Sequence, residues 1–154
     1  ACAEHAVTPD LQAYQAGRRE GLKSYCQPAN GFHEGASGRS YAGSCPARLE
    51  EDFLGAYKAG RRLYDLESRL RDLNNQIAYH DRAIVQTEQE LHDKQATVLG
   101  EDASVSERAQ ALFVGKDISD RKSKLKKDRK LLVKDRNRVQ RRLEKYRNSL
   151  AYNF

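Results

Sequence analysis

The sequence contains no tryptophan and no methionine, and it has only three prolines and three cysteines among its 154 residues. With few helix breakers and 32% charged residues, it is poorly suited to a large conventional core and well suited to long exposed helices. Its longest uncharged apolar stretches, such as residues 111–114, are far too short to span a bilayer. Because position 1 is not methionine, we expect that any targeting segment precedes this chain.

The composition changes near Cys45. Six of the ten glycines, all three cysteines and two of the three prolines lie at or before this residue. The sequence after Pro46 is charged and almost free of helix breakers until Gly100. Proline is tolerated in the first turn of a helix, so a long helix is expected to start here. We predict a Gly/Cys-rich helical module at 1–45 and a long helical segment at 46–154.

The long segment carries apolar residues at every seventh position. They are Leu63, Leu70, Ile77, Ile84, Leu91 and Val98, with Leu66 and Leu73 in the alternate positions. This spacing is typical of the seam of a coiled coil. The alternate positions become polar at His80, Thr87 and Lys94, so the outer half of this helix is expected to be held less tightly.

A turn is expected near residues 100–104. Gly100 can end the first helix in the left-handed conformation, and Ser104 and Glu107 have the spacing of a capping box that starts a second helix. The second helix has its own seven-residue seam, made of Ile118, Leu125, Leu132, Val139 and Tyr146. The short capped turn favours a hairpin, in which the second helix folds back along the first. The alternative arrangement, a parallel homodimer of each helix, is less favoured.

The two seams are symmetric about this turn. The predicted opposing pairs are Val98 and Val105, Leu91 and Leu112, Ile84 and Ile118, Ile77 and Leu125, Leu70 and Leu132, and Leu63 and Val139. The sequence therefore predicts an all-α fold in which the small module is followed by a long antiparallel coiled-coil hairpin. Each arm would contain about 50 residues and extend roughly 75 Å.

A heptapeptide, AYQAGRR at residues 13–19, returns as AYKAGRR at 56–62. Glycine on a helix face lets a second helix approach closely, and tyrosine fills the space beside it. The residues that share such a face are Tyr14, Gly17 and Gly21 in the first copy and Tyr57 and Gly60 in the second. We predict that these residues pack helices together, with residues 31–35 as a degenerate third copy.

The repeat also admits a functional interpretation. Paired guanidinium groups suit a phosphate or a carboxylate, which would make its arginines an anion site. These arginines are Arg18, Arg19, Arg61 and Arg62. Packing is favoured over an anion site because the motif lies within a predicted helix and not in a loop before one, where backbone N–H groups would be free.

The spacing of the amino-terminal residues resembles that of a known family. The pattern is Tyr14-x-x-Gly17-x-x-x-Gly21-Leu22-x-x-Tyr25-Cys26, then Gly31 and Gly35, then Tyr41-x-x-x-Cys45-Pro46, then Leu49, Phe53, Tyr57 and Gly60. Over roughly residues 2–66 it is similar to small bacterial envelope lipoproteins that form a domain family of unknown function. The resemblance implies export, a lipid anchor on a cysteine upstream of this chain, and an internal position for Cys2. It implies no activity.

In such an exported module, Cys26 and Cys45 are expected to form a disulfide around the Gly-rich loop, which would stabilise the module by roughly 3 kcal/mol. Cys2 is then left over, and we expect its partner in the segment upstream of this chain. The alternative is a zinc site. Its candidate ligands are Cys2, His5, Cys26, His33 and Cys45. The absence of a Cys-x-x-Cys spacing disfavours it, and we expect neither a metal nor a cofactor.

No arrangement typical of an enzyme is present in the sequence. Residues 37–40 combine serine and glycine but follow no predicted strand, and the acidic residues 50–52 fit the first turn of a helix. A coiled-coil hairpin also offers little concave surface for a substrate. We therefore expect no catalytic residues, with a small enzyme or metal carrier as the alternative.

The positive charge is confined to the last part of the chain. From Lys116 onward there are fifteen Lys and Arg against five Asp and Glu, whereas residues 1–115 have thirteen against seventeen. Such a basic arm is a candidate site for nucleic acid, anionic lipid or lipopolysaccharide phosphates. The candidate anion-binding residues are Lys124, Lys126, Lys127, Arg129, Lys130, Arg138, Arg141 and Arg142.

Two observations limit this interpretation. The basic arm has no aromatic residue before Tyr146, and the resemblance places the protein outside the cytoplasm, so nucleic acid is the least favoured of these partners. The alternative is that much of the charge is solvated and partly balanced by acidic residues of the opposing arm. These residues are Asp65, Asp72, Asp81 and Glu88.

We expect a noncatalytic lipoprotein of the periplasm, anchored in the outer membrane only through a lipid upstream of this chain. Its hairpin would act as a structural spacer or as a protein–protein adaptor. A surface for an envelope protein or for a second copy is indicated by the polar seam positions and by two apolar residues that lie off the seam. These residues are His80, Thr87 and Lys94, and Leu131 and Val133. Polyanion binding through the basic arm is the alternative function.

Overall fold

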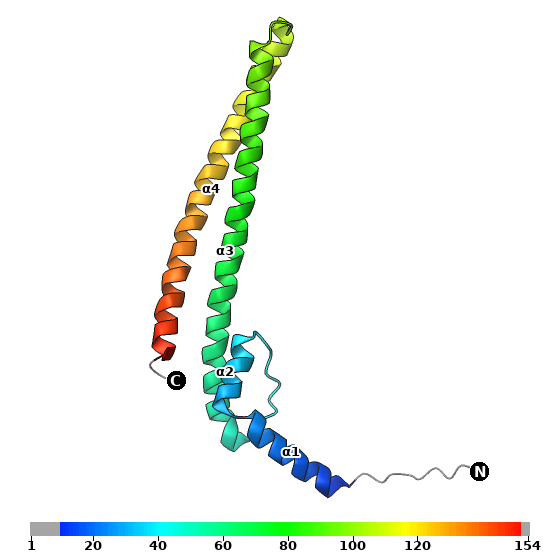
Figure 1. Cartoon of the computed structure of the whole chain (residues 1–154), viewed down its shortest axis with the longest axis vertical. Helices are drawn as coiled ribbons and strands as arrows, with labels where there is room; N and C mark the ends of the chain where they lie inside the picture. Colours follow the sequence, from blue (N-terminus) through cyan, green and yellow to red (C-terminus); the bar gives the residue numbers. More distant parts are fainter. Residues whose placement is uncertain (1–9, 152–154) are drawn as a thin grey trace, which may run out of the picture. The chain divides into compact units, whose positions relative to one another are not determined.

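The computed structural model describes residues 10–151, and all regular secondary structure in this range is α-helical (Figure 1). The helices are α1 (Leu11–Tyr25), α2 (Pro28–Ala36), α3 (Ala47–Leu99) and α4 (Val105–Ala151). The predicted all-α class is therefore confirmed. The chain divides into two compact units, Ala1–Asp65 and Leu66–Phe154, and α3 contributes to both.

The division between the units falls within α3, not at the predicted junction of 45 and 46. The reason is the packing of Phe53, which lies in the first turns of α3 and is completely buried together with Cys26 and Cys45. These turns complete the core of the first unit. The change in composition thus marks the start of a helix, and the packing unit extends further along it.

Short-range contacts fix the ends of α1 and α2. The Asp10 carboxylate accepts hydrogen bonds from the backbone N–H groups of Gln12 and Ala13, both at 3.0 Å, and so caps the start of α1. Helix α2 begins at Pro28, where the missing N–H has no cost. The loop after α2 contains Gly38 and Gly43, whose φ angles of 75° and 71° suit glycine.

Helices α2 and α3 touch backbone to backbone through three glycines. A methyl group on Gly31 would overlap the carbonyl oxygen of Phe53, and one on Gly35 would overlap that of Tyr57. From the other side, a methyl group on Gly60 would overlap the carbonyl oxygen of Phe32. The absence of side chains at these positions is what allows the two helices to approach.

In the second unit, α3 and α4 run antiparallel and side by side, as Figure 1 shows in green for α3 and in yellow to red for α4. The predicted capping box joins them at the turn. The Ser104 N–H donates to Glu107 Oε2 at 2.8 Å, and the Glu107 N–H donates to Ser104 Oγ at 3.2 Å. The hydrogen bonds from Ser104 also lower the pKa of the Glu107 carboxyl.

The end of α3 differs in detail from the prediction. Helix α3 does stop at Leu99, but Gly38 and Gly43 are the only residues with positive φ among residues 10–151, so Gly100 is not left-handed. Instead, the Gly100 N–H continues the helical pattern by donating to the Ala96 carbonyl at 3.0 Å. The Arg108 side chain donates to the carbonyl oxygens of Gly100 and Ala103 and holds the turn from the other arm.

The register of the hairpin is displaced by about one heptad from the predicted one. Lys122 and Lys126 form ion pairs with Glu88, and Arg129 forms one with Asp81. Leu125 therefore lies at the level of Ile84, the residue that was expected to face Ile118. A slip of seven residues still places one apolar seam against the other, so the seven-residue pattern fits both registers equally well.

Candidate functional site

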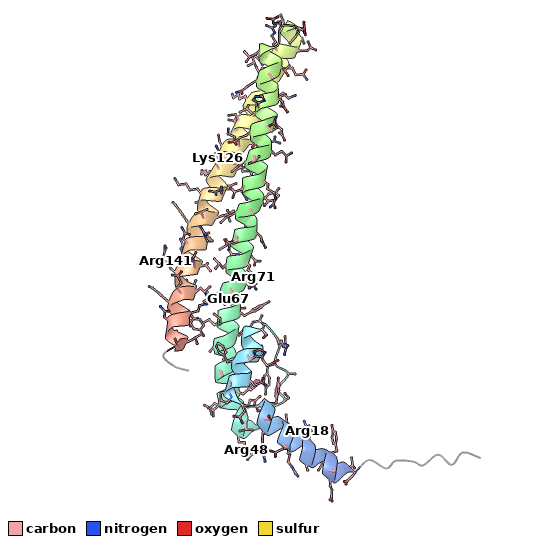
Figure 2. The ribbon with its side chains drawn as sticks, viewed as in Figure 1. Arg18, Arg48, Glu67, Arg71, Lys126 and Arg141 are labelled. Atoms are coloured by element: carbon pink, nitrogen blue, oxygen red, sulfur yellow. A yellow bond between two sulfur atoms is a disulfide. The ribbon has the colours of Figure 1, made fainter. Side chains whose placement is uncertain are left out.

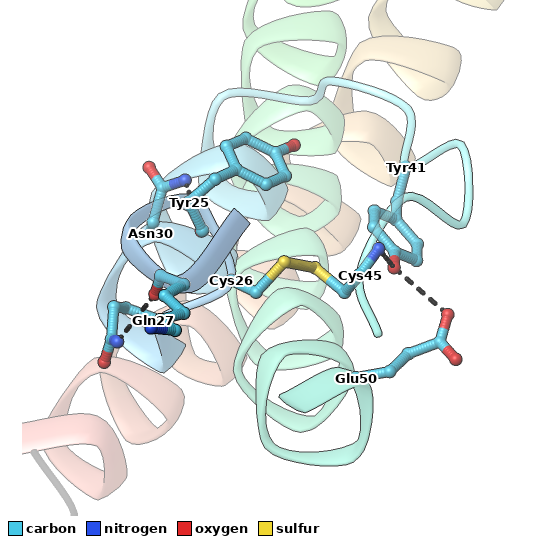
Figure 3. The surroundings of a disulfide bond; sticks show 8 residues. Tyr25, Cys26, Gln27, Asn30, Tyr41, Cys45 and Glu50 are labelled. Atoms are coloured by element: carbon cyan, nitrogen blue, oxygen red, sulfur yellow. Dashed lines mark hydrogen bonds between the residues drawn. A yellow bond between two sulfur atoms is a disulfide. The ribbon is translucent and has the colours of Figure 1, made fainter. Parts of the chain in front are cut away.

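The predicted disulfide between Cys26 and Cys45 is present, with the two Cα atoms 5.7 Å apart (Figure 3). Both half-cystines are buried beside Phe53. Because these sulfurs are bonded to each other, neither can serve as a nucleophile or as a zinc ligand. This argues against the alternative zinc site, of which Cys2 and His5 lie outside the described residues.

The surroundings of the disulfide tie the Gly-rich loop to α3. The Tyr41 hydroxyl accepts a hydrogen bond from the Cys45 N–H at 2.9 Å and donates one to Glu50 Oε1 at 3.0 Å (Figure 3). Burial raises the pKa of the Tyr41 phenol, and the Glu50 carboxylate raises it further. The Tyr41 ring also packs on Phe53, with ring centroids 5.0 Å apart. These contacts are those of a structural core.

In the second copy of the repeated heptapeptide, Tyr57, Gly60 and Arg61 all make contacts within the first unit. The Tyr57 hydroxyl donates to the Arg39 carbonyl at 2.7 Å, and Gly60 lies at the contact of α2 with α3. Arg61 donates to the Gly38 carbonyl at 2.8 Å, and its guanidinium group lies over the Tyr64 ring, 5.2 Å from the centroid. In this copy, tyrosine, glycine and arginine all hold the fold together.

The first copy has different surroundings. Tyr14 is 68% exposed, and a methyl group on Gly17 or Gly21 would meet no described atom within 4 Å. The helix packing expected of these residues is therefore not found within residues 10–151, and this corrects the prediction for the first copy. The physical reason is that α1 has no buried residue and meets the core at its end, through Leu22 and the following Cys26.

The basic arm predicted from the sequence separates into paired and unpaired cations. Three of the candidate residues form ion pairs: Lys126 with Glu88 at 3.2 Å, Arg138 with Asp135 at 3.5 Å, and Arg129 with Asp81. Hydrogen bonding and charge from Lys126 lower the pKa of Glu88. Of the acidic residues expected to balance the arm, Asp81 and Glu88 do so, whereas Asp65 pairs with Arg61 of its own helix.

The other candidate cations have no acidic partner within residues 10–151. They are Lys124, Lys127, Lys130, Arg141 and Arg142. Figure 2 shows Lys126 and Arg141 on α4. With two further lysines that the sequence analysis did not single out, the exposed cations recur at intervals of three or four residues along one side of α4. This cationic face consists of Lys127, Lys130, Lys134, Arg138, Arg141 and Lys145.

A second surface lies near the turn of the hairpin. Here α3 and α4 enclose an open groove of about 500 Å³, which we call the tip groove. Its lining residues are Leu91, Lys94, Gln95, Val98, Leu99, Ala111, Leu112, Gly115 and Lys116. Leu99 and Leu112 are 82% and 62% exposed, and Phe113 beside them is 79% exposed. Large apolar side chains are thus presented to solvent at this end of the hairpin.

From the sequence, surplus apolar surface was expected elsewhere, at Leu131 and Val133. Leu131 is indeed 52% exposed, and Val133 is partly buried. A signal for the tip was nevertheless available, because residues 111–114 are four consecutive apolar residues. A single face of a helix cannot bury four consecutive positions, so some of them had to face solvent.

Two features of residues 10–151 concern other classes of site. No helix within residues 10–151 combines the length and apolar character needed to cross a membrane. No group of three or more His, Cys, Asp and Glu side chains in the same range is arranged to hold a metal ion.

Comparison with known proteins gives a family match for the first part of the chain. Residues 1–62 match the model of a family described as a protein of unknown function (DUF2799), so the similarity covers the first unit almost completely and leaves the hairpin outside it. No curated protein and no solved structure matches the chain.

Proposed function

We propose that this chain is the noncatalytic part of an envelope lipoprotein that acts as a spacer or protein–protein adaptor through its helical hairpin. In this proposal the full-length protein resides in the periplasm and is anchored in the outer membrane by a lipid upstream of residue 1. The disulfide of the first unit supports this placement, because structural disulfides persist in oxidising compartments such as the periplasm.

The observation that carries the adaptor function is the exposed apolar surface at the tip. Leu99 and Leu112 line the tip groove from α3 and from α4 and are exposed, and Phe113, the next residue on α4, is exposed as well. Several large apolar side chains exposed at one end of the hairpin favour an interaction site more than isolated exposed residues do. Helix α4 alone has 47 residues, about 70 Å at 1.5 Å per residue, so the hairpin also has the reach of a spacer.

Polyanion binding is the second candidate function, and the cationic face of α4 supports it. Five of its six members have no acidic partner within residues 10–151, and the apolar seam containing Leu132 and Val139 lies on the other side of the helix. Spaced over about 27 Å, these cations suit the phosphates of anionic lipids or of lipopolysaccharide.

Site-specific cross-linking in cells tests both functions. A photoreactive amino acid is placed at Phe113 in the tip, at Arg141 on the cationic face, or at the exposed control position Asn74, in the full-length lipidated protein. The adaptor function predicts a protein adduct from position 113 that survives high salt. Adducts at position 113 no stronger than those at position 74 would contradict it.

The same experiment distinguishes the second function. Polyanion binding predicts that position 141 captures anionic lipid or lipopolysaccharide, and that this capture is lost at high salt.

The placement in the envelope is tested by palmitate labelling and by thiol alkylation in intact cells. We expect the full-length protein to be labelled with palmitate, and we expect Cys26 and Cys45 to resist alkylation until a reductant is added. Rapid alkylation of these two cysteines without a reductant would contradict the placement.

A further inference from the structure

We infer that the tip groove binds an amphipathic helix whose apolar ridge is flanked by carboxylates. This inference rests on the proposed adaptor function and names the chemistry of the partner. Two helices that lie side by side leave a groove into which the ridge of a third helix can pack, and helix-in-groove binding is a common form of peptide recognition.

The shape of the groove depends on a glycine. Gly115 lies in the wall formed by α4, and a Cβ atom there would come 3.8 Å from Leu91 Cδ1 and 4.0 Å from Lys94 Cβ. These are ordinary contact distances, so a methyl group would fit at this position, and a longer side chain would take up space between the two arms beside the groove. Glycine inside a helix such as α4 costs about 1 kcal/mol of helix propensity, and here it leaves the wall of the groove without a side chain.

The charges around the groove select the partner. Lys94 on α3 and Lys116 on α4 are the only ionisable residues that line it, and neither has an acidic partner within residues 10–151. The carboxylates at this level line a neighbouring pocket, which shares Lys94 with the tip groove and in which Glu90 is paired with Arg121. The remaining acidic residues of that pocket are Asp93 and Asp117. A partner with Asp or Glu beside its apolar ridge would complement both lysines.

The same charges disfavour a second copy of this chain as the occupant. A twofold symmetric contact joins the same patch of each subunit, so it would bring Lys94 and Lys116 of one copy close to those of the other. An amphipathic helix with acidic flanks meets no such repulsion. Self-association and insertion into an anionic membrane are therefore outcomes of the test that would contradict the inference.

Two designed helical peptides test the groove with the complete chain. They share one apolar ridge of leucines and differ only in the flanking positions, which are Glu in one peptide and Lys in the other. Fluorescence anisotropy is expected to show at least about tenfold tighter binding of the Glu peptide, with a difference that shrinks as salt is added. Equal affinities for the two peptides would overturn the inference.

Variants of the chain locate the binding. The double variant K94E/K116E is expected to reverse the preference between the peptides, whereas K134E, on the exposed side of α4 far from the tip, is expected to leave it unchanged. Gly115→Leu narrows the groove and is expected to weaken binding of both peptides, while circular dichroism shows an unchanged helix content. Unchanged binding in Gly115→Leu would overturn the inference.

The remaining outcomes identify a wrong occupant. Sedimentation that shows dimers lost in Gly115→Leu, or vesicles of anionic lipid that compete with the peptide at the groove, would overturn the inference in favour of that occupant. The adaptor function is judged separately by cross-linking from position 113. If the peptides fail and position 113 still captures a protein, only the acidic-helix partner is wrong; if the peptides bind and nothing is captured, the adaptor function is wrong.

Discussion

The heptapeptide at residues 13–19 and its copy at 56–62 differ at one position, Gln15 against Lys58, and yet they lie in very different surroundings. In the second copy, Gly60 touches the backbone of α2 and Tyr57 holds the following loop. In the first copy, Gly17 meets no described atom and Tyr14 is exposed. The motif therefore forms a helix in both places, and the surrounding chain determines whether another helix packs against its glycine.

The largest effect on this comparison is expected from removing the disulfide. In the double variant C26A/C45A, the unit loses the covalent link at the end of α1, and its unfolding free energy should fall by roughly 3 kcal/mol. Hydrogen exchange should show α1, with the first copy, losing protection well before α2 and the second copy. Equal loss of protection in both copies would show that the disulfide supports the whole unit and not chiefly α1.

The second largest effect is expected from Gly60→Ala. The added methyl group would overlap the backbone of α2 at Phe32 and Ala36, which the helices can relieve only by moving apart. Such overpacking typically costs about 1–3 kcal/mol, and we expect the upper end because the overlap is with backbone atoms. Urea unfolding followed by tyrosine fluorescence measures the change, and an unaltered midpoint would contradict the observed contact.

The same substitution in the first copy should act in the opposite direction. Gly17→Ala adds a methyl group in open space and improves helix propensity, so we expect α1 to gain about 0.5–1 kcal/mol. Its matched control is Gly55→Ala on α3, where the added methyl group would also meet no described atom. A loss of stability in Gly17→Ala alone would reveal a partner for that face in the protein as purified.

The smallest effect is expected from the titration of Tyr41, which lies beside the second copy. Its folded-state pKa is raised by burial, and a group with a raised pKa stabilises the fold fully below its unfolded pKa and loses that contribution as the pH rises above it. The unit should therefore lose stability above about pH 10. Absorbance of tyrosinate and unfolding measured across that range should show a smaller loss in Tyr41→Phe.

Much of the fold could be predicted because it depends on local chemistry. The capping box of Ser104 and Glu107, the end of α3 at Leu99 and the pairing of Cys26 with Cys45 all agree with the structure. The first two depend on residues within one or two turns of each other. For the disulfide, only two of the three cysteines flank the Gly-rich loop, which left few alternatives once export was expected.

The features that were missed depend on contacts between distant residues. The seam repeats every seven residues, so it could not separate the observed hairpin register from one displaced by a heptad, and the ion pairs of Glu88 and Asp81 decide between them. Likewise, the heptapeptide could not reveal which copy meets another helix. The tip groove requires both arms in the correct register before Gly115 and Leu91 can be seen as neighbours.

The register of the hairpin also has an evolutionary consequence. Because both seams repeat every seven residues, the loss or gain of one heptad in each arm preserves the face that each helix presents to the other. In the observed register, deleting residues 77–83 together with 126–132 would remove both members of the Arg129–Asp81 pair and shorten the arms by about 10 Å. During evolution, insertions and deletions of matched heptads would thus change the length of the hairpin in steps of about 10 Å and leave the residues at both of its ends unchanged.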